Sequence, residues 1–229
     1  ETQGFLSNED KQIITKIAIK EIYKFYSNGG NDEIYVPSNK ELHKMMNFIV
    51  GESVSSDYIP MMLSDLNISS HDSNSGFMPT NSSLEVLIIG AGMSGILAAI
   101  KLAERGIKFK IYEKNIDLGG TWYENKYPGS RVDIANHFYS YSFEENHQWS
   151  QHFSKQPELL DYFKKCFHKY DIQKTTYFET QVTDMKFDDS TQAWEVDSIC
   201  NGKTNKEMIN IVISCVGQLN QPKIPNIKD

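Results

Sequence analysis

The sequence has 229 residues, a formal net charge of −7, 39% hydrophobic and 23% charged residues. This length and composition are typical of a globular protein with one or two domains, and they exclude a disordered chain. The acidic balance excludes nucleic acid as an expected partner, because phosphates require a basic face. Three widely spaced cysteines argue against a disulfide framework and predict a reducing, cytoplasmic location. No apolar run reaches the roughly 20 residues of a membrane span, and no metal-ligand spacing occurs.

The charge divides the chain into two modules. Residues 1–82 hold 6 Lys, no Arg and 11 Asp or Glu, a net charge of −5, whereas the rest has a net charge of −2. Residues 67–83 are rich in Ser, Asn, Gly and Pro, a composition typical of linkers. We therefore expect a helical extension over 1–66, a linker over 67–83 and a second domain over 84–229.

The first module has helix start and stop signals. A cap at Ser7 or Asn8 predicts a helix that ends at Gly29-Gly30. A capping box at 38–41 predicts a second helix, which ends before Gly51, and a third is expected near 58–66. Because so small a module buries little surface alone, we expect it to dock on the second module or on another subunit. Four apolar side chains are expected to be buried, partly at a subunit interface: Ile13, Ile17, Met45 and Met62.

The second module begins with the elements of a βαβ unit. An apolar, β-branched run over 84–89 predicts a buried parallel strand, and a glycine-rich turn follows it at once. A helix then runs to Arg105-Gly106, and a second strand over 109–112 leads to Glu113. This order predicts an α/β fold with a Rossmann-like dinucleotide-binding domain.

The remaining elements complete a parallel sheet with an inserted β-meander. An amphipathic helix is predicted over 157–170, with Leu160, Phe163, Phe167 and Tyr170 on its apolar face. Alternating strands are predicted over 181–187 and 193–199, followed by a hairpin turn at 201–202. The apolar run over 208–216 is expected to return to the parallel sheet. Cys166 and Cys215 are expected to be packing residues, Cys215 buried and inert.

The turn between the first strand and its helix reads Gly90-Ala91-Gly92-Met93-Ser94-Gly95. Gly90 permits the tight turn, Gly92 leaves room for a pyrophosphate, and Gly95 lets the helix approach the sheet. Glu113 closes the second strand and is placed to accept hydrogen bonds from a ribose. A carboxylate there would repel a 2′-phosphate, so the loop suits FAD or NAD and not NADP.

Several longer motifs follow along the chain, at residues 119–122 (GGTW), 127–133 (YPGSRVD), 137–143, 154–158 and 216–225. Together they resemble class B flavoprotein monooxygenases of the Baeyer–Villiger type. Residues 45–52 and 57–63 resemble the helical extension of the hydroxyacetophenone monooxygenase subgroup, which implies a homodimer formed through that extension.

The resemblance implies a role for each matching residue. It assigns the FAD pyrophosphate to Gly90, Gly92, Ser94 and Gly95, and the adenosine ribose to Glu113. It assigns the ribityl and flavin end to Gly120, Thr121, Trp122 and Tyr139, the adenine to the backbone of Val182, and the pyrophosphate side to Gln218. Arg131 supports its own turn, and Asp133 is the expected catalytic residue, because the family's matching carboxylate lies beside the flavin and the nicotinamide.

The function that the resemblance implies is oxygen insertion into a ketone through a C4a-peroxyflavin, with FAD, NADPH and O2. The family's fingerprint FxGxxxHxxxWP and its NADPH domain are not found in the 229 residues. We therefore expect a flavin-binding portion that is inactive alone, with an NADPH site mostly outside it. Two alternatives stay open at this stage: an N- or S-oxygenating flavin monooxygenase, or a non-catalytic dimerising module with a relic flavin site.

Overall fold

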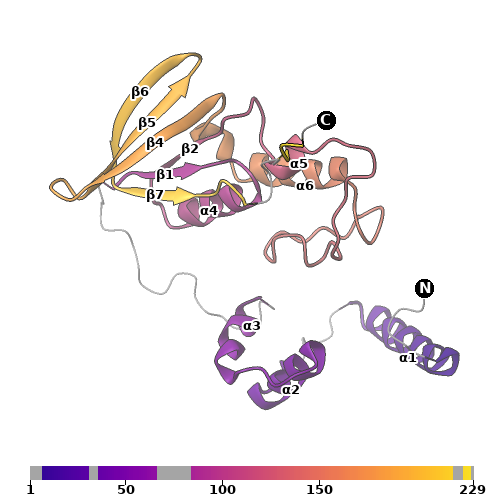
Figure 1. The fold of residues 1–229 in the computed structure, drawn as a ribbon. Helices are drawn as coiled ribbons and strands as arrows, with labels where there is room; N and C mark the ends of the chain where they lie inside the picture. The colour runs from indigo at the N-terminus through magenta and orange to yellow at the C-terminus, as the bar shows by residue number, and fades with distance from the viewer. Residues whose placement is uncertain (1–6, 31–35, 66–83, 219–223, 228–229) are drawn as a thin grey trace. The chain divides into compact units, whose positions relative to one another are not determined.

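The computed structural model describes residues 7–30, 36–65, 84–218 and 224–227 (Figure 1). The chain forms two compact units, Glu1–Ser69 and Ser70–Asp229. The predicted linker over 67–83 lies outside the described residues. No helix in the described ranges is long and apolar enough to cross a membrane.

The described part of the first unit contains three α-helices, and the predicted caps at Ser7 and Ser38 and the predicted end before Gly51 are confirmed. Helix α1 spans Asn8–Ser27, α2 spans Asn39–Val50, and α3 spans Ile59–Asp65 after a 3-10 turn. The Ser38 hydroxyl caps α2, and the Glu41 carboxylate accepts the Ser38 amide at 2.9 Å, which completes the capping box.

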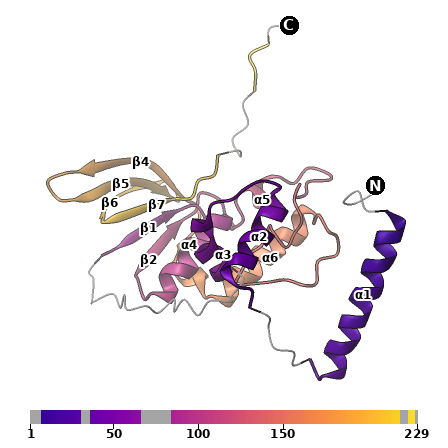
Figure 2. The same cartoon turned by 90° about the horizontal axis from the view of Figure 1, so that it is seen from below.

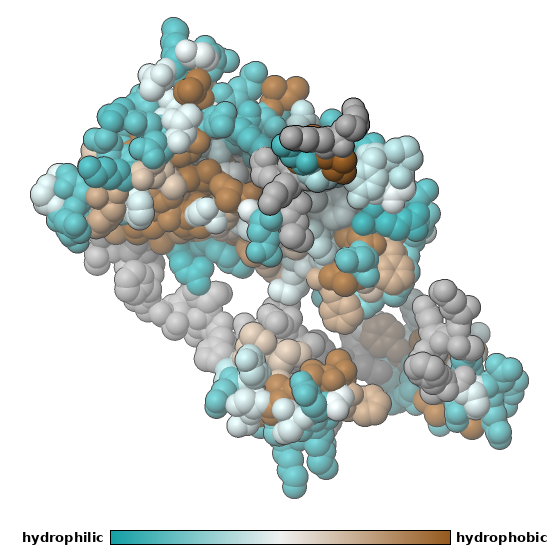
Figure 3. All heavy atoms as spheres, in the orientation of Figure 1, coloured by the Kyte–Doolittle hydropathy of each residue, from teal (hydrophilic) through white to brown (hydrophobic). Residues whose placement is uncertain are grey.

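The core of the first unit is small and belongs to α2 and α3. Leu42, Met46 and Ile59 are its buried members, whereas α1 buries none of its residues. Packing within the first unit does not bury Ile13, Ile17 or Met45 as predicted, since each side chain is about half exposed there; Met62 is half-buried against the small core. Helical spacing identified the apolar residues correctly, but the described residues of its own unit bury no residue of α1. Apolar atoms lie open on the surface of this unit (Figure 3).

The second unit is built on a parallel four-stranded sheet in the order β3-β2-β1-β7. Its strands and first helix are β1 (Val86–Ile89), α4 (Met93–Glu104), β2 (Phe109–Tyr112), β3 (Thr176–Tyr177) and β7 (Ile211–Ser214). The central strand β1 has a parallel neighbour on each side, which explains its fully apolar sequence. The predicted α/β, Rossmann-like fold is confirmed.

Helix α6 (Gln156–Lys169) packs beside α4 and completes the larger core (Figures 1 and 2). Its buried face differs slightly from the predicted one. The fully buried side chains are Leu159, Phe163, Cys166 and Phe167, together with Tyr162, whereas Leu160 and Tyr170 flank them half-buried. The stripe is rotated toward α4, because tertiary contacts decide which of two neighbouring apolar positions points inward.

An antiparallel meander is inserted between β3 and β7. It consists of β4 (Thr180–Asp188), β5 (Ala193–Cys200) and β6 (Lys203–Ile209). The predicted hairpin turn is confirmed at Asn201 and Gly202, which both have positive φ. Val196 and Ile209 of the meander pack on Leu87 and Tyr112, on the face of the parallel sheet opposite α4.

The predicted strand over 208–216 is two strands in the structure. Met208 and Ile209 end β6 in the meander, and β7 begins at Ile211 in the parallel sheet. The break falls at Asn210, whose side-chain oxygen accepts the amide of Glu85 at 2.9 Å. A single, mostly apolar segment therefore contributes to two sheets, which hydrophobicity alone does not predict.

Candidate nucleotide-binding site

A cavity of about 370 Å³ lies at the carboxyl ends of β1 and β7. The chain leaves β1 toward β2 on one side, while β7 returns on the other. Such a reversal of strand order leaves a crevice where open α/β sheets bind ligands. Gly90 and Gly92 line the cavity from the β1 side, and Cys215, Val216 and Gly217 line it from the β7 side.

Two glycine contacts shape this end of the sheet. A Cβ on Gly95 would lie 1.9 Å from the carbonyl oxygen of Gly90, so only glycine lets α4 begin this close to β1. A Cβ on Gly120 would lie 3.1 Å from the Cα of Gly92. The two glycine-rich turns therefore approach backbone to backbone and leave a cradle that contains no side chain, which fits a pyrophosphate.

The N-terminus of α4 opens into the cavity. Gly92, Met93 and Ser94 line it, and no side chain among the described residues caps the helix. The first-turn amides of a helix are donors without intrahelical partners and carry a partial positive charge, which favours an anion. The hydroxyl of Tyr141 donates to the Met93 carbonyl at 2.6 Å and fixes this turn from the core side.

Glu113 presents a buried carboxylate to the cavity; the residue is 3% exposed. The Ala91 amide donates to one carboxylate oxygen at 2.7 Å, and the Asn115 amide donates to the other at 2.9 Å. Its backbone is held as well, because its amide donates to Tyr177 and its carbonyl accepts the amide of Thr180. The carboxylate is thus fixed before any ligand arrives, and each oxygen keeps a further lone pair for a ribose hydroxyl.

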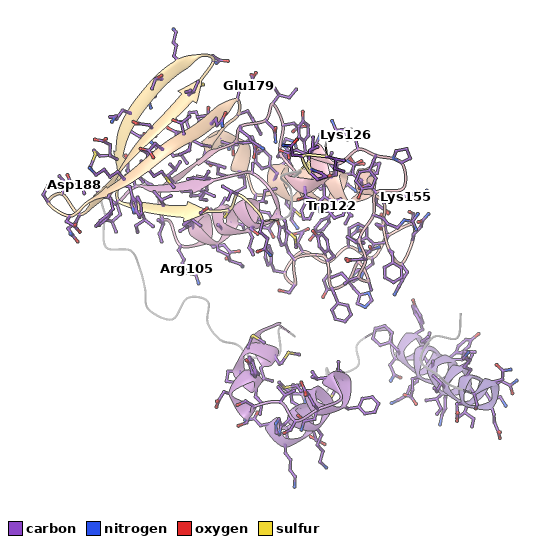
Figure 4. The ribbon with its side chains drawn as sticks, viewed as in Figure 1. Arg105, Trp122, Lys126, Lys155, Glu179 and Asp188 are labelled. Atoms are coloured by element: carbon purple, nitrogen blue, oxygen red, sulfur yellow. The ribbon has the colours of Figure 1, made fainter. Side chains whose placement is uncertain are left out.

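The far wall of the cavity is aromatic. Trp122, on the short helix α5 (Thr121–Glu124), donates its indole N–H to the Tyr139 hydroxyl at 3.0 Å, and the two rings meet edge to face. The side-chain amide of Gln156 donates to the Trp122 carbonyl and ties α5 to α6. Trp122 lies at the α5–α6 end of the unit, whereas Asp188 marks the opposite tip of the meander (Figure 4).

Polar side chains from the end of β2 and from α5 form another wall of the cavity. Lys114 and the side-chain amide of Asn115, which follow β2, both contact a Glu124 oxygen on α5, at 3.0 and 2.8 Å. Tyr112 lies next to them, and burial, followed by its bond to Glu207, raises its pKa well above the ordinary value. Its hydroxyl is therefore a neutral donor at physiological pH.

The structure brings most of the predicted site residues to this one cavity. Those lining it are Gly90, Gly92, Ser94, Glu113, Gly120, Thr121, Trp122, Tyr139 and Val182. Four predicted site residues lie outside its lining: Gly95, which is buried behind the turn, and Arg131, Asp133 and Gln218, which are exposed.

Sequence reasoning missed other lining residues, among them Tyr112, Lys114, Asn115 and Thr180. The signal for the first three was their place directly around Glu113. Cys215 corrects an expectation, because it is half-buried and lines the cavity. Burial raises the pKa of its thiol. No group of three or more His, Cys, Asp or Glu that could hold a metal occurs within the described ranges.

Fold and cavity together define a dinucleotide-binding protein, and comparisons with known proteins make this more specific. Residues 88–165 match the family model of an NAD(P)-binding Rossmann-like domain. A Baeyer–Villiger monooxygenase of Pseudomonas aeruginosa is 38% identical over 144 residues, which cover 62% of this chain and 27% of that protein. The FAD-binding monooxygenase ktnD of Aspergillus niger is 38% identical over 151 residues, 62% of this chain and 25% of that protein.

One relative extends beyond the second unit. The protein named uncharacterized monooxygenase y4iD, from Sinorhizobium fredii, is 35% identical over 195 residues. This alignment covers 83% of the chain, more than the length of Ser70–Asp229, so it reaches into the helical unit. The helical unit is therefore shared, at least in part, with that protein.

Solved structures agree with the sequence relatives. The structure of OTEMO in complex with FAD and NADP matches 64% of this chain and 28% of its own, with 32% identity and a TM-score of 0.59. Steroid monooxygenase bound to NADP matches 61% of this chain and 27% of its own, with 28% identity and a TM-score of 0.56. The resemblance to Baeyer–Villiger monooxygenases is confirmed, and the chain spans about a quarter of the length of these relatives.

Proposed function

We propose that the second unit is the FAD-binding portion of a flavin-dependent, NADPH-using monooxygenase that inserts oxygen into ketones. The observation that carries the proposal is the side-chain-free cradle that Gly92 and Gly120 line together, in the same cavity as the buried Glu113 carboxylate. A side-chain-free turn for a pyrophosphate and a fixed acceptor for a ribose are the two parts that a dinucleotide requires. The named relatives, which include FAD-binding and Baeyer–Villiger monooxygenases, support the choice of FAD.

Each part of the cavity has a proposed task. The amides at the start of α4 would hold the pyrophosphate, with Gly90, Gly92 and Ser94 around it. Glu113 would bind the adenosine ribose, and the Val182 backbone would meet the adenine. Gly120, Thr121, Trp122 and Tyr139 would line the flavin end. Bound FAD would supply the redox chemistry, namely hydride acceptance from NADPH and activation of O2.

Asp133 remains our proposed catalytic residue. The preceding segment is fixed, because the Val132 amide donates to Ser154 at 3.1 Å and Arg131 forms a β-bridge with Lys155. Asp133 itself is exposed and lies outside the cavity lining. An exposed carboxylate on a fixed turn is accessible to an arginine and a nicotinamide, the partners that the family resemblance implies. Arg131 would act by supporting this turn.

The whole activity would need more than these 229 residues, because the matched part of the chain covers only about a quarter of each relative. We expect residues 1–229 alone not to oxygenate a ketone. The test uses the full-length protein with NADPH, O2 and a panel of cyclic and aryl ketones. Ester or lactone products support the proposal. Oxygenation of amines or sulfides with no ketone product favours the N- or S-oxygenating alternative, and a colourless protein without turnover favours the relic site.

We also propose that the helical unit forms a homodimer interface. Helix α1 is 20 residues long and buries none of them, although it carries five isoleucines that are each about half exposed, at 13, 14, 17, 19 and 22. In proteins most helical stability comes from packing of an apolar face rather than from helix propensity. A second copy of the chain would supply a packing partner for α1.

The small-molecule partners would be a ketone and O2, and the three free cysteines support a cytoplasmic location.

A further inference from the structure

Glu207 joins the meander to the parallel sheet through two side chains of β2. The ammonium group of Lys110 contacts one of its carboxylate oxygens, and the hydroxyl of Tyr112 donates to the other. All three groups are shielded, since the side chains of Lys110 and Glu207 are 22% and 19% exposed. Lys110 and Tyr112 are two residues apart on a strand and so point to the same face, the face that the meander covers.

Tyr112 connects this contact to the nucleotide cavity. Tyr112 lines the cavity next to Glu113. Its carbonyl oxygen accepts the Gly90 amide at 2.8 Å, so its backbone also holds the start of the glycine-rich turn. Its ring meets Tyr177 edge to face, with centroids 5.8 Å apart. Tyr112 is thus held at three places: its backbone by Gly90, its ring by Tyr177, and its hydroxyl by Glu207.

The opposite wall of the same end of the cavity comes from the meander. Thr180, Gln181 and Val182 at the start of β4 line it. β4 pairs with β5, and β5 pairs with β6, on which Glu207 lies. The meander is therefore joined to β2 and its end at two places. Glu207 on β6 contacts Lys110 and Tyr112 of β2. At the start of β4, the Thr180 amide donates to the carbonyl of Glu113 at 2.9 Å.

We propose that Glu207 is a positioning residue for the adenosine end of the cavity, acting through Tyr112. It sets the separation between the β2 wall, with Tyr112 and Glu113, and the β4 wall, with Val182. The ligand chemistry at this end is an adenine nucleoside bearing a diphosphate. The identity of the full cofactor rests on the proposed function. The role of Glu207 at the adenosine end does not, because ADP alone probes that end.

The test compares ADP dissociation constants of full-chain variants by calorimetry, with thermal unfolding of each ligand-free protein alongside. Glu207→Ala and Tyr112→Phe should each weaken ADP binding by about tenfold, the effect of one lost hydrogen bond. The double variant should lose little more than either single variant, because both remove the same contact. Glu207→Gln keeps an acceptor and should recover most of the affinity.

Glu195→Ala is the matched control. Glu195 also lies on the meander and contacts Lys206 at 2.5 Å, but it does not line the cavity. Its loss changes the charge equally, and ADP binding should stay at the wild-type level. A contact that only stabilises the fold would lower the unfolding temperature of Glu207→Ala and leave the ADP dissociation constant unchanged; that result overturns the inference.

Failure of the proposed function gives a different pattern. A wild-type protein that binds ADP but not FAD contradicts the proposed cofactor, while the ADP comparison still decides the role of Glu207. A wild-type protein that binds neither contradicts both. If Glu207→Ala does not fold, then Glu207→Gln and Tyr112→Phe decide, and wild-type affinity in Tyr112→Phe overturns the inference.

Discussion

Two glycines three residues apart in the turn after β1 have separable tasks. A Cβ at position 95 would collide with the Gly90 carbonyl, whereas a Cβ at position 92 would lie 3.5 Å from the Gly120 Cα, an ordinary contact distance. Gly92 also has a φ of −80°, which any residue adopts. The fold therefore requires Gly95, whereas Gly92 is required only by what occupies the cradle.

This separation gives a paired prediction. Gly95→Ala should lower the free energy of unfolding by about 3 kcal/mol or more, because backbone must move. Gly92→Ala should change it by about 0.5 kcal/mol at most, yet weaken FAD binding at least about tenfold, because the methyl group occupies the cradle. Denaturant unfolding and flavin-fluorescence titration measure the two effects. Wild-type FAD affinity in Gly92→Ala would remove the cradle from the site.

Asp133 gives the second prediction at this scale. Because Asp133 lies outside the cavity lining, Asp133→Ala should keep FAD bound and the fold stable. In the full-length protein it should slow flavin reduction by NADPH by about 10²-fold, the usual effect of losing one positioning contact. Anaerobic stopped-flow reduction of the flavin-loaded variant measures this. A variant that loses flavin and stability together would show that Asp133 serves only its own turn.

At the scale of elements, α6 carries a prediction about pH. Burial raises the pKa of the Cys166 thiol from 9.0 to about 11. Because the folded pKa is the higher one, the neutral thiol contributes stability that is complete below about pH 9 and is lost as the pH rises toward 11. The free energy of unfolding should therefore fall over this window, and Cys166→Ala should flatten the fall.

Urea unfolding between pH 8 and 11 tests this, with Cys200→Ala, a half-buried thiol on β5, as the control. Tyr141 and Tyr162 lie in the same core, and burial raises the pKa of each far above the ordinary value of 10.0, so their contribution begins to fall only above about pH 10 and continues to fall at higher pH. An unchanged slope in Cys166→Ala would place the alkaline loss in these tyrosines or elsewhere.

Elements also show what the sequence can and cannot predict. Signals that act within a few residues succeeded: the capping box at Ser38, and the βαβ order around Gly90–Gly95 that ends at Glu113. The sequence alone did not reveal that Glu207 contacts Tyr112, because the pairing joins residues 95 positions apart. The break at Asn210 and the rotated face of α6 were not predicted for the same reason, because residues distant in sequence determine both.

At the scale of the whole molecule, the exposed apolar residues of α1 require a partner. Deleting residues 1–66 should convert a dimer into a monomer of the second unit, because the helical unit holds the proposed interface. Sedimentation velocity on the full chain and on the deletion variant measures this, and Ile13→Asp with Ile17→Asp is the milder variant. An unchanged oligomeric state in a soluble deletion variant would place the interface elsewhere or leave α1 to the second unit.

We expect the cavity at the carboxyl ends of β1 and β7 to bind FAD. The most direct measurement is to release the bound nucleotide from the purified full-length protein by denaturation and to identify it by chromatography and absorbance. We expect FAD, at nearly one molecule per chain, and a yellow oxidised-flavin spectrum before release. The Glu113→Arg variant should lose the bound FAD. Release of NAD alone, or full FAD retention in Glu113→Arg, would contradict it.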